Sequence, residues 1–150
     1  MASFDEVAEL IRTMYASVWS EWYRGRAGVP RATLRVEPGC LTSGYDPKTD
    51  TVWIYVAEGN LEDHDIADPE AWPIWRIELI EEMLHEYQYK MVRTPSAVGR
   101  RLFEQHNRRF SDRGHGDDFF TAIAECSSSL GMSPEQLIDA LCGLNFPGGS

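Results

Sequence analysis

Residues 73–90 carry the pattern that most constrains the fold of this chain. At about 100° per residue, the apolar side chains of this stretch share one side of an α-helix: Ile77, Ile80, Met83, Leu84 and Tyr87. The other side collects Glu78, Glu81, Glu82, His85, Glu86 and Tyr89. The pattern predicts a helix that begins near Pro69–Pro73 and runs through Lys90, with one face in the core and the other dense in acid.

The segments before this helix predict a second helix and a small sheet. An N-terminal helix opens on the capping-box pattern Ser3–Glu6 and ends near Gly25–Gly28. Strands are expected at Thr33–Glu37 and Thr51–Val56, because both runs are rich in β-branched or alternating apolar residues. Residues 45–50 have the chemistry of a tight turn, so we expect a small antiparallel sheet.

The segments after residue 96 predict three more helices. One covers residues 97–110, one starts at Asp117, and one starts at a second capping box, Ser133–Gln136. The 150 residues suffice for one hydrophobic core, and no repeat or linker divides them. We therefore expect a single α+β domain over residues 1–150, made of an N-terminal helix, a small antiparallel sheet and several C-terminal helices.

Charge and composition limit the classes of partner. The formal net charge of −10 argues against a general nucleic-acid binder, because phosphate contacts need local lysine or arginine. Residues 87–113 hold seven basic residues against Glu104 and Asp112, so a weak interaction with nucleic acid stays open there. The side chains that would meet phosphate are Arg100, Arg101, Arg108 and Arg109.

The sequence also indicates in which cellular compartment the protein is expected. No run approaches the roughly 18 apolar residues that a membrane span needs, so no membrane partner is expected. The first residues are acidic and periodic, unlike a signal peptide. Cys40, Cys126 and Cys142 are scattered and odd in number, which is typical of free thiols in a reducing compartment. We therefore expect a cytoplasmic protein.

The acidic face of the 73–90 helix holds a metal-binding pattern. Glu81 and His85 are four residues apart, so one helical turn aims both side chains at a common point, and Glu82 lies between them. This is the geometry of the H-E-x-x-H metalloprotease helix with Glu81 in place of the first histidine. In metalloproteases the two outer residues of this pattern bind the metal, and the glutamate between them accepts a proton from water. The plainer alternative is an acidic face exposed to solvent.

A second motif extends the pattern into a family resemblance. Thirty residues after His85 lies His115, within the segment Gly114-His-Gly-Asp-Asp-Phe119. Together with Glu78-Leu-Ile-Glu-Glu-Met-Leu-His-Glu86, it makes the chain resemble the SprT-like zinc metallopeptidases over roughly residues 4–130. The resemblance implies a compact zincin-like domain with a ligand-bearing helix. It also implies His85 and His115 as metal ligands, Glu82 as general base, and a protein or peptide substrate added as a strand along Thr51–Val56.

Glu81 departs from the family pattern at the first ligand position. A carboxylate is a competent zinc ligand, and two histidines with one glutamate form a known catalytic set. An anionic ligand also shifts the preference toward a harder ion such as manganese. We expect a zinc-dependent peptidase that hydrolyses peptide bonds through a metal-activated water. The alternative is a catalytically impaired zincin-like pseudoenzyme that works as a protein-binding module.

A competing register remains open on the same helix. His85-Glu-Tyr-Gln-Tyr89 also fits H-E-x-x-H, with Glu86 as base and Tyr89 near the metal. It ranks lower because a phenol, with a pKa of about 10, is a poorer ligand at neutral pH than a carboxylate. The two other histidines are not expected to be ligands, since His64 lies in an acidic loop and His106 on an apolar helical stripe.

Overall fold

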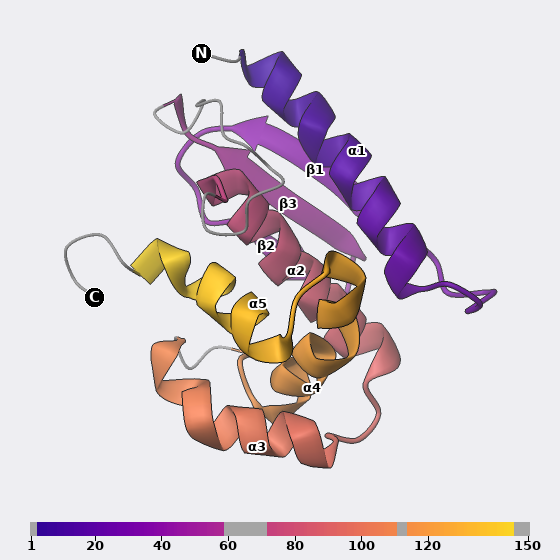
Figure 1. The fold of residues 1–150 in the computed structure, drawn as a ribbon. Helices are drawn as coiled ribbons and strands as arrows, with labels where there is room; N and C mark the ends of the chain where they lie inside the picture. The colour runs from indigo at the N-terminus through magenta and orange to yellow at the C-terminus, as the bar shows by residue number, and fades with distance from the viewer. Residues whose placement is uncertain (1–2, 59–71, 111–113, 146–150) are drawn as a thin grey trace. The chain divides into compact units, whose positions relative to one another are not determined.

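The computed structural model of the chain describes residues 3–58, 72–110 and 114–145 (Figure 1). It is a mixed helix and sheet structure, which confirms the α+β class. The chain divides into two compact units, residues 1–83 and 84–150. The boundary falls inside the long helix α2, Ile74–Met91, so each unit contains one half of that helix.

The first unit opens on helix α1, Phe4–Trp22. The predicted capping box is confirmed, because Ser3 Oγ accepts the Glu6 N–H at 3.2 Å and Glu6 Oε1 accepts the Ser3 N–H at 3.1 Å. These two bonds satisfy backbone donors that the first helical turn leaves unpaired.

The sheet of the first unit differs from the prediction. Strands β1 (Thr33–Pro38), β2 (Gly44–Asp46) and β3 (Thr51–Val56) lie in the order β1-β3-β2. The expectation of an antiparallel sheet is wrong for β1, which pairs parallel with β3, while only β2 is antiparallel to it. The tight turn at 47–50 joins β2 to β3 rather than β1 to β3. Because β2 returns the chain first, β1 runs in the same direction as β3.

This topology also corrects the expected substrate edge. β3 is the central strand, with β1 along its whole length and β2 along Thr51–Trp53. Beyond β2, the Tyr55 N–H donates to Ser43 Oγ at 3.0 Å. The strand predicted to receive a substrate peptide therefore has neighbours on both sides.

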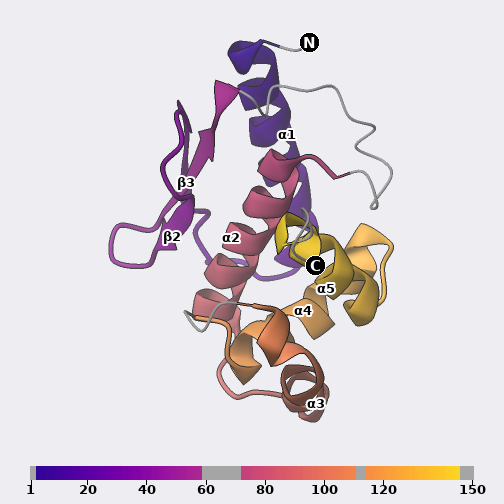
Figure 2. The same cartoon turned by 90° about the vertical axis from the view of Figure 1, so that its left-hand side faces the viewer.

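The core of the first unit lies on one face of this sheet. Val52, Ile54 and Val56 are buried, while Trp53 and Tyr55, which alternate with them, stay half-exposed. Helix α1 and the first half of α2 both lie on the same side of the sheet (Figure 2). The predicted boundaries of α2 are confirmed to within a few residues, and its five predicted core residues are all buried.

The second unit is helical. Besides the end of α2 it contains α3 (Ala97–His106), α4 (Asp117–Cys126) and α5 (Pro134–Leu141), with 3-10 turns after each at Asn107–Arg109, Ser127–Leu130 and Cys142–Asn145. The starts predicted at Asp117 and at the second capping box are confirmed. The helix predicted over 97–110 ends at His106 instead. At its end the Asn107 side chain donates to the Phe103 carbonyl at 2.6 Å, as a side chain that competes with helix extension does.

Helices α3 and α4 approach each other closely at Gly99. A Cβ atom placed there would lie 2.0 Å from Thr121 Oγ1 and 2.7 Å from Thr121 Cα. The same hydroxyl accepts the Ser96 N–H at 3.0 Å and donates to the Asp117 carbonyl at 2.9 Å. The contact therefore leaves room only for glycine at position 99.

Two further expectations can be compared with the described residues. None of their helices combines the length and apolarity that a membrane crossing needs. Cys40, Cys126 and Cys142 are free thiols, as their spacing predicts; Cys40 is exposed and the other two are buried.

We expect Gly99→Ala to destabilise the protein by about 1–3 kcal/mol through overpacking against Thr121. Alanine at an unconstrained helix position would instead stabilise it by about 0.5–1 kcal/mol. Urea unfolding measures the difference, and Gln105→Ala on the exposed side of α3 is the control. A Gly99→Ala protein as stable as the wild type would contradict the packing described.

Candidate metal centre

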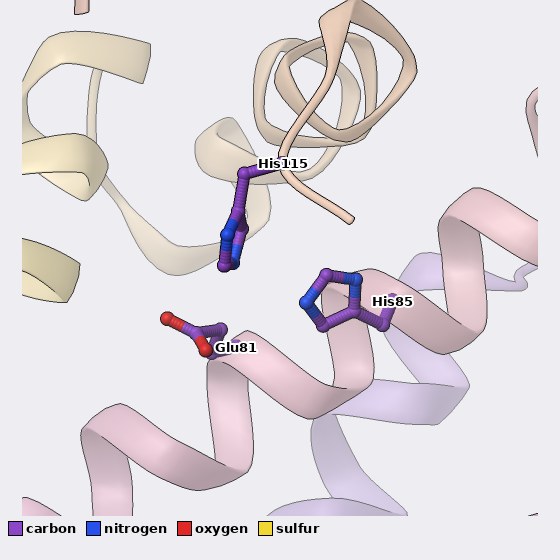
Figure 3. A group of neighbouring side chains, drawn as sticks. All are labelled: Glu81, His85 and His115. Atoms are coloured by element: carbon purple, nitrogen blue, oxygen red, sulfur yellow. The ribbon is translucent and has the colours of Figure 1, made fainter. Parts of the chain in front are cut away.

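Three side chains of the sequence pattern come together around one point. Glu81 and His85 lie one turn apart on α2, and His115 precedes α4. One potential ligand atom from each lies within 4.8 Å of the other two. Figure 3 shows all three side chains directed toward a common space. Glu81, His85 and His115 thus form a group that could hold a metal ion.

The approach of His115 depends on the glycine before it. Gly114 has a φ of +70°, a conformation that glycine adopts without strain. A Cβ atom on Gly114 would lie 3.2 Å from His85 Cε1 and 3.7 Å from His85 Nδ1. Position 114 therefore needs glycine both for its backbone and for the space beside the His85 ring.

Aromatic rings surround the two histidines. The ring centroids of His85 and His115 are 5.0 Å apart, and Phe119 packs against both at 4.7 Å and 4.6 Å. Phe110 lies 5.1 Å from His115. This packing shields His115 Nε2 from solvent. Rings held by such contacts lose little further freedom when they bind an ion.

Glu82 occupies the position of the predicted general base and is 7% exposed. Burial raises the pKa of its carboxyl to about 8, and the neighbouring Glu81 and Glu78 carboxylates contribute in the same direction. A cation near these groups would favour the charged form instead. The carboxyl of Glu82 is therefore sensitive to the presence of a metal ion.

The acidic face of α2 is not simply exposed to solvent. Burial also raises the pKa of Glu78, whose carboxylate accepts a hydrogen bond from the Ser43 hydroxyl. Glu86 is fully buried and pairs with Lys90 Nζ at 2.6 Å. The helical wheel placed these carboxylates opposite the core, but in the described structure Glu86 is buried and Glu78 is half-buried, and each has a polar or charged neighbour.

The same contacts bear on the competing register. Its base would be Glu86, whose carboxylate is engaged by Lys90, and its ligand would be Tyr89, which is 60% exposed. Glu81, by contrast, has a carboxylate oxygen within 4.8 Å of a ring nitrogen of His85 and of His115. The geometry favours the register with Glu81 as ligand and Glu82 as base.

The remaining predicted residues lie elsewhere or cannot be placed. His106 is half-buried at the end of α3 and is not in the metal group, while His64 lies outside the described residues. Of the four arginines, Arg109 pairs with Asp139 at 2.8 Å and Arg100 donates to the Pro95 carbonyl at 2.8 Å. Arg101 and Arg108 are exposed.

Sequence reasoning missed the partners of the histidine and glutamate side chains. Gln88, one turn after His85, places its Oε1 3.1 Å from His85 Nδ1. Ser43 contacts Glu78 from the segment before β2. The i, i+3 spacing of His85 and Gln88 is a signal that a search for ligand partners would find. No spacing signals Ser43, because it is 35 residues from its partner.

The donor set fits a divalent transition metal. Two imidazoles and one carboxylate form a known set for catalytic zinc, with room for a further ligand. The same set with its harder oxygen ligand also suits manganese or iron. The group could therefore hold a metal ion, and its donor atoms match the ligand preferences of zinc, manganese and iron.

The chain matches no protein-family model, and no curated protein or solved structure is found similar to it. The geometry of the described residues is thus the basis on which a function can be proposed.

In the metal-free protein, we expect stability to fall as pH rises from about 4.5 to about 8. The folded state keeps a proton on Glu82 that the unfolded chain releases, so unfolding becomes easier by up to about 1.4 kcal/mol per pH unit. Glu82→Gln stays neutral and should be more stable than the wild type above pH 8. Unfolding with chelator present measures this, with Glu104→Gln as control. If the free energy of unfolding changed with pH in the same way in the wild type and in Glu82→Gln, the raised pKa of Glu82 would be refuted.

We expect Gly114→Ala to weaken zinc binding by about tenfold or more, because the new methyl group would displace the His85 ring. Gly131→Ala is the matched control. Its φ of +72° imposes the same backbone cost of about 1–2 kcal/mol, but a Cβ there meets nothing within 4 Å. Zinc affinities from chelator competition should therefore separate the two variants, and equal affinities would contradict the close approach.

Proposed function

We propose that this protein is a zinc-dependent peptidase of SprT-like type. The observation that carries the proposal is the convergence of Glu81, His85 and His115, with ligand atoms within 4.8 Å of one another. Glu82, a buried carboxyl, follows the first of them on the same helix. Substrates would be proteins or peptides, as the resemblance to that family implies.

Each residue has a distinct role in the proposed reaction. Glu81, His85 and His115 would hold the ion, which when bound supplies Lewis acidity toward water and the peptide carbonyl. Glu82 would accept a proton from the attacking water and later deliver it to the leaving amine. Phe119 and Phe110 would exclude bulk water beside the histidines.

The pKa of Glu82 links its role to the ion. Burial and two neighbouring carboxylates keep this carboxyl protonated near neutral pH in the metal-free protein. A protonated carboxyl cannot act as a base. Because a nearby dication favours the carboxylate form, Glu82 would become competent only when the site is loaded.

A protein-binding pseudoenzyme is the second candidate, and the identity of residue 81 favours it. An anionic ligand neutralises part of the positive charge of the metal ion, so water at the site would be less acidic than with three histidine ligands. The same substitution favours manganese as the alternative ion. In this case the site would stabilise the fold and a partner surface rather than hydrolyse peptides.

Elemental analysis of protein purified without chelator tests the proposal first. We expect about one divalent ion per wild-type chain and much less in Glu81→Ala and His115→Ala, because each loses one of three ligands. His106→Ala, which removes a histidine outside the group, is the control and should keep the ion. Wild-type protein without stoichiometric metal would overturn the peptidase proposal.

Cleavage of a casein-type substrate separates the two candidates. The loaded wild type should cleave it, and Glu82→Gln should lose at least about a hundredfold in rate, while Glu104→Gln should not. Cleavage that survives Glu82→Gln would disprove the assigned base. A metal-bound wild type that is inactive, together with activity gained in Glu81→His, would favour the pseudoenzyme.

A further inference from the structure

We propose that Gln88 is a positioning residue that selects Nε2 of His85 as the metal-binding atom. The inference rests on the proposed metal site and concerns how that site is prepared before an ion arrives. It depends on contacts within the second unit, between α2 and the segment around Gly114.

The geometry places the two ring nitrogens of His85 in different surroundings. Nδ1 lies 3.1 Å from Gln88 Oε1, one helical turn later on α2. The other nitrogen, Nε2, faces the space toward which Glu81 and His115 are directed (Figure 3). The ring thus presents one nitrogen to the amide and the other to the candidate ion position.

The amide oxygen determines which nitrogen carries the proton. An amide oxygen only accepts hydrogen bonds, so a bond to it requires the proton on Nδ1. A neutral imidazole then has its lone pair on Nε2, which is the form that a metal needs at that atom. The opposite tautomer would direct an N–H bond at the ion and block coordination.

Two other contacts fix the plane of the same ring. Gly114 lies so close that a Cβ atom there would be 3.2 Å from His85 Cε1. Phe119 packs against the ring with centroids 4.7 Å apart. A ring flip would exchange Nδ1 with Cδ2 and Nε2 with Cε1, and the packing at the Cε1 edge and against Phe119 opposes that rotation. Gln88 supplies the polar contact that such packing alone does not.

Zinc affinity tests this role with three variants. Gln88→Leu removes the acceptor and should weaken zinc binding by about 10–100-fold in chelator competition. Gln88→Glu keeps an acceptor at the same length and should bind at least as tightly as the wild type. Gln105→Leu, the same substitution at an exposed position of α3, should change nothing. Circular dichroism confirms that each variant is folded.

The zinc affinities of these variants show whether Gln88 presents its amide oxygen or its amide nitrogen to His85 Nδ1. Gln88→Leu binding zinc as tightly as the wild type would overturn the proposal. Gln88→Glu losing as much affinity as Gln88→Leu would also overturn it, because the amide would then be donating to Nδ1 through its nitrogen. Absence of peptidase activity in any of these proteins would bear on the proposed function alone.

Nitrogen-15 NMR of the metal-free protein tests the tautomer directly. At a pH where the imidazole is neutral, the wild-type spectrum should show His85 protonated at Nδ1 and unprotonated at Nε2. Gln88→Leu should shift this population toward the other tautomer, and Gln105→Leu should not. A wild-type ring protonated at Nε2 would refute the role of Gln88 whether or not the protein binds zinc or cleaves peptides.

Discussion

The burial of carboxylates along α2 is the constraint on which the rest of the candidate site depends. A carboxylate taken out of water needs a proton, a hydrogen-bond donor or a cation close by. Glu86 has Lys90, and Glu78 has the hydroxyl of Ser43. Burial raises the pKa of Glu82, and the neighbouring carboxylates of Glu81 and Glu78 raise it further. The helix therefore retains one acidic position at which a cation would relieve an electrostatic cost.

The second unit supplies histidines that are restrained before any ion is present. Phe119 packs against both rings, and Gly114 brings the loop of His115 against His85. Gln88 adds a polar contact at the nitrogen that faces away from the site. Such restraints lower the entropic cost of coordination, so a set of ligands with one unusual member can still bind an ion.

Much of this arrangement could be predicted from local sequence. Periodicity located α2, and two capping boxes located the starts of α1 and α5. The i, i+4 spacing of Glu81 and His85 predicted that their side chains approach a common point, and the structure confirms it. The parallel pairing of β1 could not be predicted, because β2 has only three residues and lacks a strand pattern. The burial of Glu82 was also missed, since a helical wheel shows which side chains share a face but not what covers that face.

The hydroxyl of Ser43 has a consequence for how the sheet meets other chains. Beyond the short β2, the Tyr55 N–H of the central strand would be the next donor available to an added strand. Ser43 Oγ accepts that hydrogen and donates its own to Glu78 on α2. A side chain thus takes the position of a backbone carbonyl and ends the ladder. The protein closes this stretch of sheet against edge-to-edge association with a single hydroxyl rather than with a further strand.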